Sequence, residues 1–152
     1  WEEHRLWERP TELCVRHDYD PLSRTWHSME TLVKMEDAPF AHGAMRECYR
    51  LKKMSQFSPT FFFRMDWRHC ANYVAKRYKA HDTPRQSYLD DVMMQMEAKR
   101  WSARYNALGP PKPVDFLQAF ALEFPHRGGA IFATERLIDG SYTKYNGNSG
   151  YV

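Results

Sequence analysis

The sequence lacks long apolar runs and has only three cysteines. No stretch approaches the roughly 18 consecutive apolar residues of a membrane-spanning helix, and no charged-then-apolar leader opens the chain. We therefore expect a soluble cytoplasmic protein that does not bind membranes. Cys14, Cys48 and Cys70 are widely spaced and odd in number, which indicates reduced thiols in place of a disulfide framework. No zinc motif can be built from them alone.

Neither sign of charge dominates this chain of 152 residues. It has 22 Lys and Arg against 19 Asp and Glu, a net charge of +3, and the two signs are interleaved. No basic stripe forms, so we expect no nucleic-acid partner. The length suits one domain with a real core. The chain opens without methionine and stops after a turn-rich stretch, so we expect it to be a piece of a longer protein.

Apolar spacing predicts one long helix and several strands. Between residues 85 and 106, apolar residues recur at helical spacing, with Pro84 before them and Gly109 after them. The stretch 24–35 is ambiguous between a short helix and a strand, and we favour a short element near the sheet. Alternating polarity predicts strands at 43–52, 72–78, 114–124 and 130–138, with a further short run at 142–145.

The connections between these strands favour antiparallel pairing. Gly128 and Gly129 predict a hairpin between the last two long strands. A long aromatic connection containing Phe61–Phe63 would join the strands at 43–52 and 72–78. The predicted fold class is α+β, a mainly antiparallel twisted sheet with one dominant helix.

Lys76 stands out because it lies inside an apolar strand. Side chains alternate between the two faces of a strand, so Lys76 shares a face with Val74. A lysine on a partly buried face needs an anionic partner. A nucleotide phosphate is one candidate, and a structural ion pair is equally compatible with the pattern.

Four features together match the parts of a nucleotide-binding lobe: a glycine turn at Gly43 before Arg46, the Lys76 strand, Glu97 in the helix and Glu135 in the last hairpin. A helix carboxylate would hold the lysine in one position, and Glu97 is the natural candidate. The alternatives are surface pairs: Glu97 with a neighbouring arginine of its helix, and Glu135 across its strands. Neither a Walker A loop nor a Gly-x-Gly-x-x-Gly loop is present.

Longer motifs carry a family resemblance. The segments 43–48 (GAMREC), 72–78 (NYVAKRY), 95–99 (QMEAK), 145–146 (YN) and 148–150 (NSG) resemble the alpha-kinases, a family of atypical serine/threonine protein kinases. The resemblance implies ATP and Mg²⁺ as cofactors and an alpha-kinase N-lobe-like fold for residues 23–152. It also implies that the catalytic C-lobe is absent and that the isolated chain is inactive.

The resemblance implies roles for individual residues. Lys76 and Arg46 would contact the nucleotide phosphates beneath the turn of Gly43, Ala44 and Met45, and Glu97 would be the helix partner of Lys76. Glu135 would bind the adenine side of the nucleotide, with Leu137 and Ile138 as hinge contacts. The expected substrate is a protein Ser or Thr, with elongation factor 2 as one candidate. A non-catalytic regulatory or scaffold module with the same lobe is the alternative.

Residues 1–22 are interpreted as a separate regulatory segment. A tryptophan-led segment precedes the kinase domain in a member of this family and targets calmodulin, which implies that Trp1 and Leu6 bind this partner. Pro10 and the acidic residues argue against an uninterrupted basic target helix. The alternative is a tail packed on its own domain.

Overall fold

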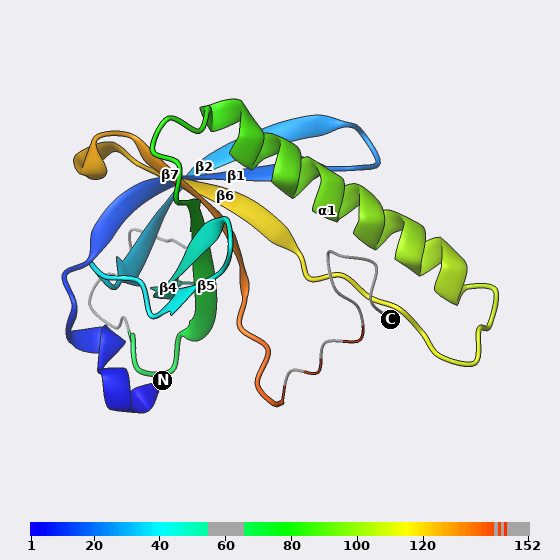
Figure 1. Ribbon diagram of the computed structural model, residues 1–152, viewed down its shortest axis with the longest axis horizontal. Helices are drawn as coiled ribbons and strands as arrows, with labels where there is room; N and C mark the ends of the chain where they lie inside the picture. The colour runs from blue at the N-terminus through cyan, green and yellow to red at the C-terminus, as the bar shows by residue number, and fades with distance from the viewer. Residues whose placement is uncertain (55–65, 142, 144, 146–152) are drawn as a thin grey trace.

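A computed structural model describes residues 1–54, 66–141, 143 and 145. The predicted α+β class is confirmed, because one main helix packs on an antiparallel sheet (Figure 1). The described elements are the short 3₁₀ turns η1 (Glu2–His4), η2 (Leu6–Glu8) and η4 (Pro125–Arg127), the strands β1 (Glu12–Asp20), β2 (Thr25–Met35), β3 (Ala41–His42), β4 (Arg46–Lys53), β5 (Ala71–Tyr78), β6 (Ala119–Phe124) and β7 (Ala130–Arg136), and the helix α1 (Arg85–Asn106).

The sheet closes on itself. Its strand order is β2-β1-β6-β7-β5-β4-β3, and β2 also pairs with β4 through Val33 opposite Lys53 and Met35 opposite Leu51. Every pairing is antiparallel. Six strands therefore form a small barrel, and β3 extends it beside the first half of β4. Closure leaves few exposed strand edges, which favours a single well-defined register.

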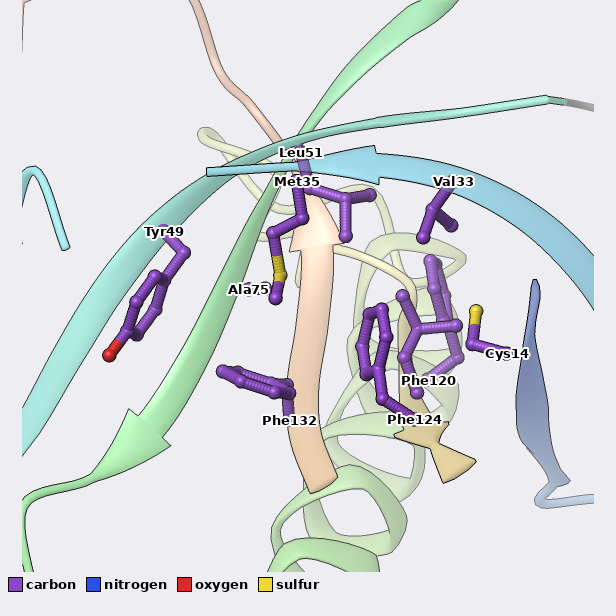
Figure 2. Packing of buried hydrophobic residues seen from close by; sticks show 10 residues of the cluster. Cys14, Val33, Met35, Tyr49, Leu51, Ala75, Phe120, Phe124 and Phe132 are labelled. Atoms are coloured by element: carbon purple, nitrogen blue, oxygen red, sulfur yellow. The ribbon is translucent and has the colours of Figure 1, made fainter. Parts of the chain in front are cut away.

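The barrel wall has an inner face filled by large side chains and an outer face that α1 covers over β1, β6 and β7. Strand β6 shows the alternation: Phe120, Leu122 and Phe124 point inward, whereas Ala119 and Ala121 lie under the helix. Small residues on the outer face let α1 approach the sheet closely. The side chains that gather in the barrel interior in Figure 2 come from β1, β2, β4, β5, β6 and β7: Cys14, Val33, Met35, Tyr49, Leu51, Ala75, Phe120, Leu122, Phe124 and Phe132.

The helix has the bounds that its spacing predicts. It begins directly after Pro84, and the chain leaves the helical conformation before Gly109, whose φ of 68° suits a residue without a Cβ. Tyr88 and Val92 anchor its first half on the sheet. The second half extends past the strands in Figure 1, and Trp101 there is 59% exposed.

Several strand predictions need correction. Strand β4 begins only at Arg46, so the predicted residues 43–45 form the turn before it, and β7 ends at Arg136. Residues 114–118 are not part of a strand, because β6 begins only at Ala119. The preceding stretch instead bonds to the helix, where the Lys99 ammonium donates to the Phe116 carbonyl oxygen at 2.7 Å. The ambiguous stretch 24–35 forms the long strand β2. The aromatic connection at Phe61–Phe63 and most of the run at 142–145 lie outside the described residues.

The amino-terminal segment is built into the barrel. Residues 12–20 form β1, which pairs with β2 and β6, so a boundary at residue 22 does not separate two structural units. Leu6 is fully buried, so the expectation that it binds a partner is wrong for this conformation. Trp1 is half-buried and packs edge-on against Phe40, with ring centroids 5.8 Å apart. The segment therefore fits the alternative of a tail packed on its own domain.

Lys53 at the end of β4 should destabilise the fold near neutral pH. It is 3% exposed, and burial is the main cause that lowers its pKa from 10.5 to about 8. Between these two pH values the unfolded state binds more protons than the folded state, so stability rises with pH. We expect Lys53→Met to raise the free energy of unfolding by about 1–2 kcal/mol at pH 7.

Urea denaturation at pH 7 and at pH 10 checks this expectation. The increase in the free energy of unfolding caused by Lys53→Met should be smaller at pH 10, because the wild-type amine is neutral there in the folded state. Lys112→Met, at an exposed position, is the control and should change little at either pH. An equal gain at both values would show that added apolar packing, and not the charge of Lys53, accounts for the effect.

Candidate functional site

Lys76 makes an ion pair with Glu135 on the face of the sheet that α1 covers. Strands β5 and β7 are neighbours, with Val74 opposite Glu135 and Lys76 opposite Ala133, so all four side chains lie on this face. The Lys76 ammonium donates to Glu135 Oε1 at 2.5 Å. Their side chains are 29% and 19% exposed, respectively. This partial burial protects the pair from solvent screening and leaves part of the ammonium accessible.

The helix holds the same carboxylate from the other side. Gln95 of α1 donates its side-chain N–H to Glu135 Oε2 at 3.1 Å and to the Leu117 carbonyl oxygen at 2.9 Å. Each oxygen of Glu135 therefore has its own donor, which fixes the carboxylate and with it Lys76. Sequence reasoning missed Gln95, although it follows the buried Val92 by three residues and so shares its helix face.

Glu97 is not the acid that steadies Lys76, which corrects the sequence-based expectation. Its carboxylate lies 3.5 Å from the guanidinium of Arg100, one turn along α1. Two residues correspond to about 200° around a helix, so Glu97 points away from the side of Gln95. The structure thus realises the alternative of a pair within the helix. The acidic partner of Lys76 is Glu135 of β7.

A second cation and its acid lie beside the first pair. Arg46 at the start of β4 places Nη2 2.8 Å from Asp91 of α1 and donates to the Tyr78 hydroxyl at 2.8 Å. Tyr78 in turn donates to Asp91 at 2.9 Å. Burial and this bond to Asp91 raise the pKa of Tyr78, against the opposing effect of Arg46. Asp91 and the Tyr78 hydroxyl together hold the Arg46 guanidinium over the Tyr78 ring, with its central carbon 4.6 Å from the ring centroid.

Both pairs border one crevice between α1 and the sheet. Arg46, Lys76, Asp91, Gln95 and Glu135 all line a cavity of about 20 Å³. Such a space holds about one water molecule, far less than the ~300 Å³ or more of a ligand pocket. A larger anion would therefore lie over the crevice, where Arg46 and Lys76 are about one-third exposed.

The turn before Arg46 is exposed to solvent. Gly43 donates its backbone N–H to the Arg46 carbonyl oxygen at 2.8 Å, closing the turn between β3 and β4. Gly43, Ala44 and Met45 are all exposed. The Met45 carbonyl oxygen accepts a bond from the Lys79 N–H at 3.0 Å, which ties the turn to the end of β5. The predicted turn is present at this edge of the barrel.

The predicted hinge residues follow β7. Leu137 donates its backbone N–H to the Asn72 carbonyl oxygen at 3.0 Å, so the chain continues beside β5 past the last residue of the strand. Ile138 is 69% exposed and available for contact. The structure therefore brings Arg46, Lys76 and Glu135 together and places the turn and the hinge residues at the ends of the same strands.

The described residues contain neither a metal-ligand cluster nor a membrane-spanning helix. No group of three or more His, Cys, Asp and Glu side chains there could hold a metal ion. No helix within residues 1–54 and 66–141 is long and apolar enough to cross a membrane.

Comparison with known proteins places these features in context. The alpha-kinase family profile matches residues 41–152. Human eukaryotic elongation factor 2 kinase is 44% identical over the whole chain, and Dictyostelium discoideum myosin heavy chain kinase B is 40% identical over 93% of it. The chain spans about a fifth of the length of these relatives, 20% and 18% respectively.

Solved structures agree with the sequence comparison. The inactive alpha-kinase domain of myosin heavy chain kinase A in complex with ATP superposes with a TM-score of 0.77 at 25% identity, covering 95% of this chain and 68% of that one. The same domain in complex with AMP also gives a TM-score of 0.77, over 94% and 69% of the two chains.

Proposed function

The chain belongs to the alpha-kinase family, and from this premise we propose that it forms the ATP-binding part of a protein serine/threonine kinase. The observation that carries the proposal is the pair of fixed cations, Lys76 and Arg46, at one crevice between α1 and the sheet. A triphosphate concentrates negative charge, and cations held in place need no rearrangement to bind it. The solved relative with ATP supports the choice of nucleotide.

The geometry and the family support a proposed role for each site residue. Lys76 and Arg46 contact the phosphates, and the exposed turn of Gly43, Ala44 and Met45 covers them. Glu135 fixes Lys76 through its carboxylate. The adenine side is proposed to contact Glu135 at the end of β7 and the two residues that follow the strand, Leu137 and Ile138. The described residues hold no group of three or more His, Cys, Asp and Glu side chains for a metal ion, so the proposed Mg²⁺ would be bound mainly by the phosphates of the nucleotide.

The proposed substrate is a protein Ser or Thr. The relative named eukaryotic elongation factor 2 kinase makes elongation factor 2 the first candidate. Calmodulin remains a proposed partner through Trp1, which would have to leave Phe40 in order to dock. Calmodulin binding to the wild type and to Trp1→Ala checks this partner. We expect calcium-dependent binding that the substitution abolishes.

Calorimetric titration of the chain with the ATP analogue AMP-PNP in magnesium buffer tests the central proposal. We expect saturable binding with one nucleotide per chain, displaced by ATP and ADP. No saturable heat from a folded chain would overturn it. A phosphate-transfer assay on the longest protein that contains this chain separates the two functions: transfer to protein Ser or Thr supports the kinase, and nucleotide binding without transfer supports the regulatory or scaffold module.

A further inference from the structure

A second basic hollow lies at the end of the barrel where α1 begins. Its volume is about 240 Å³, and its basic lining residues are Arg77, His81, Arg85 and Arg127. Gly128 and Gly129 of the β6–β7 turn complete one wall. Among the described residues no Asp or Glu lines it: Asp82, in the same loop as His81, is exposed but does not contribute to the lining. Three guanidinium groups and an imidazole from four segments of the chain thus face one space.

Two of the arginines are held in place by carboxylates. Arg127 donates through Nε and Nη2 to the two oxygens of Glu12, both at 2.7 Å. Arg85 donates through the same two nitrogens to Glu123, at 3.1 and 2.9 Å. Among the described residues, Nη1 of each guanidinium makes no hydrogen bond. A planar guanidinium that is fixed along one edge can donate its remaining N–H groups to a ligand with little further loss of side-chain entropy.

Arg77 supplies a cation that forms no ion pair with a described residue, although Glu47 lies opposite it on β4. It follows Lys76 on β5, but its side chain lies on the opposite face of the strand, with its guanidinium carbon 5.9 Å from the centroid of the Phe132 ring. Within residues 1–54 and 66–141 it makes no ion pair. Glu12, Asp37 and Glu123 offset the charges of Arg127 and Arg85. The charge of Arg77 is therefore the excess that a bound anion would neutralise.

We propose that this hollow binds a phosphate dianion, either as free phosphate or as the phosphoryl group of a phosphorylated side chain. A carboxylate offers two oxygens and is satisfied by one arginine, whereas a phosphoryl group offers at least three acceptor oxygens and can engage several. The volume of about 240 Å³ suits a small anion better than a whole cofactor. The ligand class is therefore a single phosphoryl group.

The proposed phosphate site is distinct from the nucleotide crevice. The two cavities share no lining residue. They are linked through Tyr88, which lines the phosphate hollow and whose hydroxyl accepts the backbone N–H of Tyr78 at 3.1 Å. Tyr78 in turn contacts Arg46 and Asp91. Because the cavities are separate, mutations can test each site alone.

Titration of the isotope-labelled chain with inorganic phosphate, followed by amide NMR at constant ionic strength, tests the proposal. We expect saturable shifts at Arg77, Gly128 and Gly129 that sodium chloride does not reproduce. Arg77→Gln should weaken binding about tenfold or more, because it removes a charged donor. This variant breaks no ion pair of the described residues, so it should stay folded. Arg104→Gln, on the exposed second half of α1, is the matched control and should leave the affinity unchanged.

Two further arms identify the source of the phosphate and exclude the nucleotide site. Tighter binding of a phosphoserine peptide than of inorganic phosphate would assign the site to a phosphorylated protein segment, and equal or weaker binding would assign it to free phosphate. In Lys76→Met the shifts at Gly128 and Gly129 should persist. Shifts confined to the neighbourhood of Lys76, or shifts at the hollow that Arg77→Gln leaves intact, would overturn the proposal.

Discussion

Lys76→Met is expected to raise the Kd for ATP roughly 10- to 150-fold, the largest effect that we expect from a single substitution. Methionine keeps the length of the side chain and removes the ammonium, which is the donor that Glu135 positions. A hydrogen bond to a charged group contributes about 1.5–3 kcal/mol, and this range sets the expected change in Kd. Calorimetric titration with AMP-PNP measures it directly.

Lys79→Met is the matched control for this experiment. Lys79 lies one residue beyond β5 and is exposed, so its loss removes the same charge at nearly the same place without touching the crevice. Its Kd should stay within about twofold of the wild-type value, since exposed charges act weakly through solvent. Equal losses in the two variants would mean that net charge, and not a specific contact with Lys76, drives nucleotide binding.

The sequence contained enough local signal to predict the helix and most of the strands. Pro84 and Gly109 bracket α1, and its predicted bounds of 85 and 106 agree with the structure. No local sequence pattern indicated that the barrel closes. Closure depends on the pairing of β2 with β4 at Val33 and Lys53, and strand tilt and stagger over the whole sheet decide that pairing. No single segment encodes it.

Some features of the candidate site could likewise be predicted from local sequence, and others depend on the whole fold. Alternation along β5 correctly placed Lys76 on one face with Val74, because that inference needs only one strand. The partner of Lys76 depends on which strand lies next to β5 and on the rotation of α1. The rotation could have been inferred from the sequence: buried Tyr88 and Val92 define the inward face, and Gln95 continues it, whereas Glu97 does not. The adjacency of β7 required the complete topology.

Glu135→Gln is expected to weaken nucleotide binding roughly tenfold, whereas Glu97→Gln should leave the Kd unchanged. The two substitutions are matched, because each replaces a carboxylate by an amide of nearly the same shape. Only Glu135 holds the Lys76 ammonium, so only its loss lets that ammonium sample other positions and raises the cost of fixing it on a phosphate. AMP-PNP titrations of both variants measure the difference.

The sign of the Glu135 effect separates positioning from simple electrostatics. Removing a negative charge near a triphosphate lowers repulsion, so a purely Coulombic account predicts tighter binding in Glu135→Gln. The fixed geometry of the carboxylate, bonded through one oxygen to Lys76 and through the other to Gln95, predicts the opposite. Gln95→Leu removes the second donor to Glu135, together with the bond to the Leu117 carbonyl oxygen, and should then give a smaller loss in the same direction. A gain in affinity in Glu135→Gln would mean that Glu135 competes with the phosphates for Lys76.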